Sequence, residues 1–185
     1  DLEEVAKEVK KALDELLKRN EDSARRVKEA IRELLKRIND VTREVEETLD
    51  RLLKEVEDGG VPEEDLKRAE DEVRRLKEDL KRRDERLERA ARTLEREIDK
   101  LLDENRRKVE RLKEEIDDLA RKGQPAERVV KRLEELLREA AEHSKRSNDE
   151  LERLLDRLRR EVERYERELE KRKKEAKELA DKLRK

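Results

Sequence analysis

Residues 27–56 read VKEAIRELLKRINDVTREVEETLDRLLKEV, and the spacing of their apolar side chains decides the fold. An apolar residue recurs every three or four positions, at Val27, Ile31, Leu34, Ile38, Val41, Val45, Leu49, Leu52 and Val56. Side chains at this spacing share one side of an α-helix, and most residues between them are charged. The stretch therefore predicts one amphipathic helix of about eight turns without a break.

The same apolar series repeats every eighteen residues. Leu2, Asn20, Ile38 and Val56 hold equivalent positions in the first third of the chain. Eighteen residues in five steps is about 3.6 residues per step, the period of a straight α-helix rather than of a left-handed supercoil. The rest of the chain carries the same period, with equivalent positions at Leu66, Asp84, Leu102 and Ala120, and then at Ala126, Ser144, Val162 and Ala180.

Two short segments interrupt this pattern, DGGVP at 58–62 and GQP at 123–125. Each combines a glycine that can end one helix with a proline suited to the first turn of the next. They predict helices over about 2–57, 62–122 and 125–185. Because short loops make neighbouring helices antiparallel, we expect an all-α fold: one up-down-up antiparallel three-helix bundle of long, nearly straight helices over residues 1–185.

Charge dominates the composition of the 185 residues, with 59% charged and only 31% hydrophobic. The 54 Lys and Arg residues and the 56 Asp and Glu residues are finely mixed, and the net charge is −2. Such mixing leaves no large field of one sign, so neither nucleic acid nor a membrane surface is an expected partner. The apolar runs are too short to span a membrane, and the first residues do not resemble a signal peptide, so we expect a soluble protein without a targeting signal.

The supply of apolar residues bears on oligomeric state and stability. One core of three long helices consumes nearly all of them, which predicts a monomer that requires no partner. Long helices, mixed surface charge and tight loops predict hyperstability, with unfolding above about 90 °C. A disordered chain or an isolated charged helix would not need an apolar series kept in phase throughout each segment.

The uncharged polar residues are few, and outside the loops they lie on or beside the apolar series. Folding the chain at its two loops places position p of the first helix opposite position 120 minus p of the second and beside position p plus 127 of the third, each to within about one turn. This arrangement predicts two core polar networks, each drawing on all three helices. The first contains Asn20, Ser23, Asn105, His143, Ser144, Ser147 and Asn148, and the second contains Asn39, Thr42, Asp84 and Tyr165. Buried polar groups need such partners, since each unpaired group costs about 1–3 kcal/mol.

Some of these residues also fit a different interpretation. Ser147 and Glu150 match a capping box, and Asn20 and Asn39 are compatible with helix starts, which together would give six or seven shorter helices. The apolar series keeps its phase through all these places without Gly or Pro, which favours continuous helices.

Enzyme chemistry finds little support in this chain. It has no Cys and one His, and Ala140 stands where a di-metal bundle would place the Glu of a Glu-x-x-His pair. His143 with Ser144 or Ser147 could in principle form a nucleophilic relay, but all three are near neighbours on one predicted helix. No glycine-rich phosphate loop is present. We therefore expect no catalytic residue, no metal and no cofactor.

In several features the chain resembles computationally designed, parametric helical bundles with hydrogen-bond networks in their cores. These features are the eighteen-residue repeat, the equal helices, charged surfaces such as RLRREVER at 157–164, the Gly/Pro loops and the segregated Asn, Ser, Thr and Tyr. The resemblance covers the whole chain. It implies a structural scaffold whose polar networks set register and oligomeric state. Spectrin-like repeats and crescent-shaped membrane-bending dimers are less similar, because no core Trp and no cationic face occur here.

A second functional class remains open, that of an interaction module. Doubled leucines widen the apolar stripes of the first and third predicted helices, at 16–17, 34–35, 52–53, 136–137 and 154–155. If these stripes bordered an open groove, a fourth helix from another chain or another copy would dock there. Such a module would self-associate or form a heterodimer, whereas the scaffold would stay monomeric.

Overall fold

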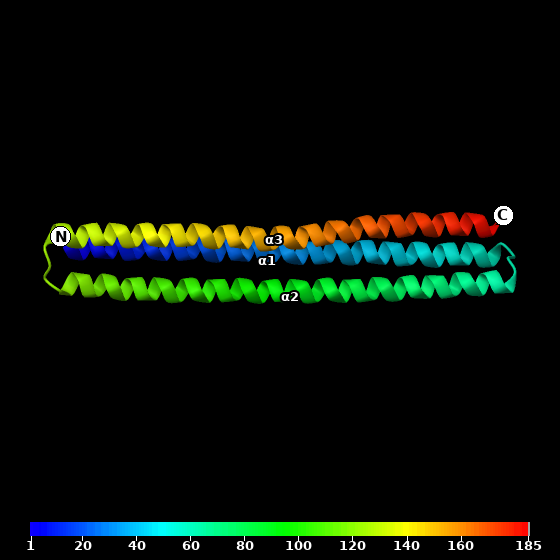
Figure 1. Cartoon of the computed structure of the whole chain (residues 1–185), viewed down its shortest axis with the longest axis horizontal. Coiled ribbons are helices and arrows are strands. Elements are labelled where there is room, and N and C mark those ends of the chain that lie inside the picture. The colour runs from blue at the N-terminus through cyan, green and yellow to red at the C-terminus, as the bar shows by residue number, and fades with distance from the viewer. Residues whose placement is uncertain (185) are drawn as a thin grey trace. The chain divides into compact units, whose positions relative to one another are not determined.

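The computed structural model describes residues 1–184, which form three α-helices joined by two short loops (Figure 1). Helix α1 spans Leu2–Asp58, α2 spans Glu63–Arg121 and α3 spans Ala126–Arg184. The fold is all-α, as predicted, and five of the six helix boundaries lie within one residue of the predicted positions. The sixth prediction, Lys185, lies outside the described residues. Because each helix is continuous, the alternative of six or seven shorter helices is wrong.

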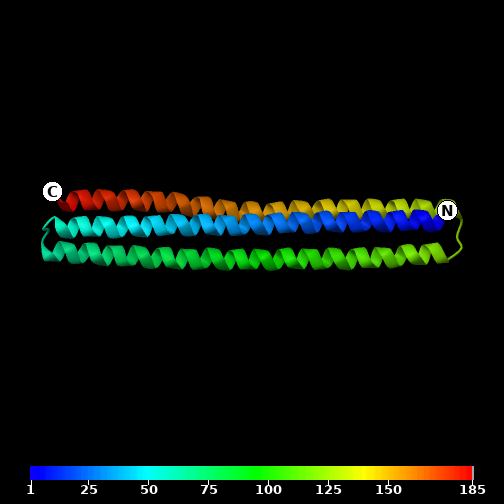
Figure 2. The same cartoon turned by 180° about the vertical axis from the view of Figure 1, so that it is seen from behind.

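Glycine ends the first two helices. Gly60 has a φ of 69° and Gly123 a φ of 61°, both in the left-handed region that side chains with a Cβ rarely adopt. Residues at this φ turn the chain out of the helix, as in the common glycine C-cap. The two loops that follow are visible from behind in Figure 2.

Proline begins the next helix in each case, as expected. The carbonyl of Pro62 accepts a hydrogen bond from the amide of Leu66 at 3.1 Å, and the carbonyl of Pro125 accepts one from Val129 at 3.2 Å. Each proline therefore joins the first turn of its helix, where the missing N–H removes no helical hydrogen bond.

The chain forms two compact units, and every helix contributes to both. Unit 1 comprises Asp1–Ala30 and Thr93–Leu155, and unit 2 comprises Ile31–Arg92 and Asp156–Lys185, its final residue being undescribed. In each unit three helical segments pack against one another, so each has the core of a three-helix bundle. We describe the units separately.

The core of unit 1 contains large apolar side chains from all three helices. Leu13, Ile116 and Leu136 are fully buried. They belong to a continuous apolar cluster, called here the apolar cluster of unit 1, whose buried members are Ala6, Val9, Leu13, Val109, Leu112, Ile116, Val129, Leu133, Leu136 and Ala140. Burial of these stripes is the main force holding the segments together.

The core of unit 2 combines large and small apolar side chains. Ile38, Leu158 and Leu169 are buried to within 1% of full burial. A separate group, called here the alanine cluster, has the buried members Leu52, Val56, Ala69 and Ala180. Partly buried side chains pack against it, namely Leu53, Val61, Leu66, Ala176 and Leu183.

Ion pairs between α1 and α2 show how the side chains of antiparallel helices meet. The pairs are Lys10–Asp117, Asp14–Lys113 and Lys28–Asp99 in unit 1 and Asp50–Lys77 in unit 2. In each pair the two residue numbers add up to 127, whereas folding the sequence at its loop predicted about 120. Helical side chains lean toward the N-terminus of their own helix, so antiparallel partners lean in opposite directions and meet at higher combined numbers.

Parallel helices lack this displacement, because their side chains lean the same way. Between α1 and α3, Asn20 bonds Ser144, and Arg37 pairs with Glu166. The number differences are 124 and 129, on either side of the predicted 127. The lean of the side chains thus accounts for the direction of the error in one helix pair and for its absence in the other.

Candidate functional site

Unit 1 brings polar side chains from all three helices into its core. Asn20 of α1, Asn105 of α2 and Ser144 and Ser147 of α3 are 3–6% exposed, and His143 of α3 is half-buried. These five residues are called here the polar level of unit 1. All five were predicted members of the first network.

The polar level of unit 1 consists of two hydrogen-bonded groups. The Ser144 hydroxyl donates to Asn20 Oδ1 at 3.0 Å, which joins α3 to α1. The Ser147 hydroxyl donates to Asn105 Oδ1 at 3.1 Å, and His143 Nε2 lies 2.7 Å from the same oxygen, which joins α3 to α2. Because an amide oxygen only accepts, the neutral His143 ring donates through Nε2–H.

Two other predicted members of the first network are not bonded into it. Ser23 is half-buried, and its hydroxyl oxygen accepts a hydrogen bond from Arg26 at 3.4 Å on the same helix. Asn148 is half-buried, and its Oδ1 is buried without a hydrogen-bond partner. Each of the two is the sequence neighbour of a buried residue, Ala24 or Ser147, on the core face of its helix. The predicted height along the bundle was therefore correct, but the prediction that these side chains point into the core was wrong.

The electrostatics around His143 favour its neutral form. Partial burial is the main cause that lowers its pKa below the ordinary 6.5. The positive charges of Lys108 and Arg146 lower the pKa further, and Glu104 opposes them. The lowered pKa keeps the ring neutral near pH 7, where it serves as a hydrogen-bond donor to Asn105.

Unit 2 contains a second polar level, formed by Thr42 of α1, Asp84 of α2 and Tyr165 of α3. Thr42 and Tyr165 are buried and Asp84 is half-buried. The Thr42 hydroxyl donates to Asp84 Oδ1 at 3.0 Å. The Tyr165 hydroxyl donates to the backbone carbonyl of Leu80 at 3.2 Å. These bonds connect α2 to both of its neighbours.

Asn39 does not belong to the polar level of unit 2, so its sequence-based placement needs correction. Its side chain is exposed, while the preceding residue, Ile38, is almost fully buried. A step of one residue turns a helix by about 100°, which carries Asn39 from the core face to the surface. Being next to a buried residue in the sequence was therefore not enough to predict that Asn39 would be buried.

The acid–base properties of the polar level of unit 2 follow from burial. The pKa of Asp84 is raised above 3.8, chiefly because burial penalises the charged carboxylate, although the hydroxyls of Thr42 and Tyr165 lower it in part. Burial likewise raises the pKa of the Tyr165 hydroxyl. The Arg83 guanidinium lies 5.7 Å from the centre of the Tyr165 ring, close enough for a cation–π contact, and pairs with Glu168.

A further buried polar residue was missing from the predicted networks. Thr48 of α1 is 6% exposed, and its hydroxyl donates to the carbonyl of Glu44 at 2.9 Å, one turn earlier in the same helix. Such a bond satisfies a buried threonine without any partner on another helix. The only sequence signal was its place beside Leu49 on the apolar face.

The chemistry available at these two levels is that of neutral hydrogen bonding with one carboxyl group. Within residues 1–184, no three His, Cys, Asp or Glu side chains are grouped so that they could hold a metal ion. No described helix is long and apolar enough to cross a membrane. Both levels lie inside helical packing, and their bonds connect helices to one another.

Comparison with protein-family models, with curated proteins and with solved structures finds no match.

Proposed function

We propose that this chain is a de novo designed structural scaffold, whose buried polar levels specify the pairing of its helices and its oligomeric state. The observation that carries this proposal is that hydrogen bonds between helices occur at a buried level in each unit, such as Ser144–Asn20 and Thr42–Asp84. Regular helices without irregular connections, glycine and proline confined to the loops and an almost wholly charged surface support the design origin.

The polar levels discriminate between registers more strongly than the apolar series does. If one helix slid by a turn, apolar rungs spaced every three or four residues would again face apolar rungs. A polar rung would instead face Leu or Ile, and each stranded group would cost about 1–3 kcal/mol. A few polar levels therefore select one arrangement, as single buried Asn residues do in coiled coils.

The distribution of apolar surface supports a monomer. Among the residues that the structure describes, Leu179 is the only exposed large hydrophobic side chain. The second residues of the doubled leucines do not form an open stripe, since Leu17, Leu35 and Leu137 are half-buried and Leu155 is buried. A stable dimer interface needs a contiguous apolar surface that these residues do not offer.

The proposal is tested by breaking the polar level of unit 1 in two ways. The single variant Asn105→Leu removes the acceptor of Ser147 and His143 and should lower the free energy of unfolding by about 1–3 kcal/mol. The grouped variant Asn105→Leu, Ser147→Ala, His143→Leu removes all three groups and should be as stable as the wild type or more stable. Denaturant midpoints in guanidinium chloride measure both effects.

The matched control is Asn39→Leu, the same substitution at an exposed position of α1. We expect its stability to stay within about 0.5 kcal/mol of the wild type. Light scattering should give 22.4 kDa for the wild type and a mixture of larger species for a variant in which both polar levels are apolar. If that variant stays monomeric, or if Asn105→Leu behaves like Asn39→Leu, the polar levels do not specify the assembly.

Hyperstability belongs to the same proposal. Idealised helices with tight loops unfold above about 90 °C in this class of scaffold. A thermal melt followed by circular dichroism that ends below about 65 °C would contradict the design interpretation.

An interaction module for a fourth helix is the second candidate function. The feature that favours it is Leu179, an exposed leucine that lines the same apolar space as members of the alanine cluster. A molar mass of 44.8 kDa, twice that of one chain, would support self-association through this edge and contradict the monomeric scaffold. The remaining partners, nucleic acid and membrane, stay outside the proposal because the charges are balanced.

A further inference from the structure

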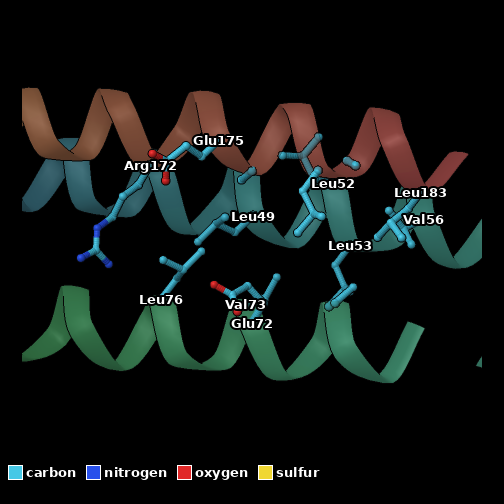
Figure 3. A pocket seen from close by; sticks show the side chains of 14 residues that line it. Leu49, Leu52, Leu53, Val56, Glu72, Val73, Leu76, Arg172, Glu175 and Leu183 are labelled. Carbon is cyan, nitrogen blue, oxygen red and sulfur yellow. The ribbon is translucent and has the colours of Figure 1, made fainter. Parts of the chain in front are cut away.

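Unit 2 contains an apolar cavity between its three helical segments (Figure 3). Its volume is about 100 Å³, and all but three of the fourteen residues around it are Ala, Val or Leu. Leu49 and Leu53 of α1 and Val73 and Leu76 of α2 border the space in the figure. The apolar part of this site offers a water molecule few hydrogen-bond partners.

The cavity has a cause in the sequence. Ala69 of α2 and Ala176 and Ala180 of α3 line it, at positions of the helical period where other levels carry larger side chains. Ala69 and Ala180 are buried, so their backbones are held in the packing while their methyl groups leave space unfilled. Three short side chains around one point therefore produce the void.

The cavity also has an entrance. Leu179, which is 42% exposed, is one of the residues around it. An exposed leucine at the edge of an apolar cavity means that a bound molecule would remove further apolar surface from water. Entry would therefore not require the helices to separate completely.

The charges at the edge argue for an uncharged occupant. The three polar lining residues are Glu72, Arg172 and Glu175. Arg172 already donates to Asp79 at 3.1 Å, so its charge is compensated by a residue of the chain. A ligand anion would compete with Asp79 and face two carboxylates, and a cation would leave water for an apolar interior.

We propose that this cavity binds one compact, uncharged apolar molecule of about the size of a single-ring hydrocarbon. Its volume is somewhat smaller than that of apolar protein cavities of about 150 Å³, which stay dry and take up benzene, and its open side leaves the ligand additional room. At about 100 Å³ the cavity is too small to receive the row of side chains that a docking helix would present. The site is separate from both polar levels and from the scaffold function proposed above.

Benzene is the probe for the test, and the methyl groups of leucine and valine report its position. We expect ¹H–¹³C spectra of the intact chain to show saturable shifts for Leu49, Leu53 and Val73, while methyl groups of unit 1 such as those of Leu13 do not shift. A benzene ring placed among these methyl groups changes their local magnetic environment. No saturable shift up to the solubility limit of benzene, or equal shifts in both units, would overturn the proposal.

Filling the cavity tests the same site from the protein side. Ala176→Leu places a larger side chain in the space and should weaken benzene binding by at least about tenfold. Ala141→Leu is the matched control, because Ala141 is exposed on the same helix, and it should bind like the wild type. If the leucine variant does not fold, Ala176→Val provides a smaller filling and should still weaken binding. Wild-type affinity in a folded Ala176 variant would overturn the assignment.

Discussion

The apolar cluster of unit 1 and the alanine cluster of unit 2 arise from the same sequence pattern but pack differently. In unit 1 the fully buried members include Leu13, Ile116 and Leu136, and the space beside Leu13 amounts to only about 20 Å³. In unit 2 two of the four buried members of the alanine cluster are Ala69 and Ala180, and a cavity of about 100 Å³ lies beside them. The apolar period determines which residues turn inward, but side-chain volume determines how completely they fill the core.

The two polar levels differ in a similar way. The level of unit 1 combines amides, hydroxyls and a neutral imidazole, whereas the level of unit 2 contains the carboxyl group of Asp84. Neutral groups lose little when they leave water if they are paired, but a carboxylate resists burial even with a donor. The units should therefore respond differently to mutation and to pH.

The largest expected difference concerns truncation of the two apolar clusters. Leu13→Ala in unit 1 should lower the free energy of unfolding by about 3–5 kcal/mol, since the side chain is fully buried and borders a space of only about 20 Å³. Leu52→Ala beside the alanine cluster should cost nearer to about 2 kcal/mol, because Leu52 is 8% exposed and already borders a void. Guanidinium denaturation measures both, and equal costs would mean that the cavity does not loosen the packing around it.

The next effect concerns the donor to Asp84. Thr42→Val keeps the shape of the side chain but removes the hydroxyl, which leaves the half-buried carboxylate without that hydrogen bond. We expect a cost of about 1–3 kcal/mol at pH 7 from denaturant midpoints. Thr48→Val is the control, since it removes a bond to its own helix only, and should cost less than about 1 kcal/mol. If Thr48→Val cost more than Thr42→Val, the hydrogen bond from Thr42 to Asp84 would not be the more important of the two for stability.

Tyr165→Phe should have a smaller effect. The hydroxyl donates to the Leu80 carbonyl, so its removal takes one hydrogen bond from the polar level while the ring stays buried. We expect a loss of about 0.5–1.5 kcal/mol in the free energy of unfolding. A loss well above this range would indicate that the same hydroxyl also stabilises the Asp84 carboxylate, whose pKa it lowers.

The smallest effects concern pH, because His143 and Asp84 are both only half-buried. The folded pKa of His143 is lowered, so its contribution to stability is present above about pH 6.5 and is lost as the pH falls through the folded value. The folded pKa of Asp84 is raised, so its contribution is present below about pH 3.8 and is lost as the pH rises through the folded value. The two levels thus respond to acid with opposite signs.

Variants separate these two contributions from the titration of the many surface carboxylates. As the pH falls below about 6.5, the free energy of unfolding of the wild type should decrease relative to that of His143→Gln. As the pH rises above about 3.8, the free energy of unfolding of the wild type should decrease relative to that of Asp84→Asn. Differences that do not vary with pH would mean that neither group is perturbed by folding.

Much of the fold could be predicted because its signals are local. The apolar period, the glycines before each break and the prolines after them act within a few residues, and they located the helix ends. The polar residues were predicted less completely. Asn20 lies on the apolar series and is bonded across helices. Thr42 and Asn39 each lie one residue from the series, beside Val41 and Ile38, yet only Thr42 is buried and bonded to another helix, whereas Asn39 is exposed.

By itself the sequence determined the all-α class, the three helices and the face that each of them buries, since helical period and chain-breaking residues depend only on backbone geometry. Only the tertiary structure decided which side chains meet, because the contacts between antiparallel helices lie about two turns from where the loop would place them. The lean of the side chains accounts for the direction of that shift. The tertiary structure also decided that Ala69, Ala176 and Ala180 surround one cavity. Their coincidence depends on how separate helices are aligned, which no local pattern encodes.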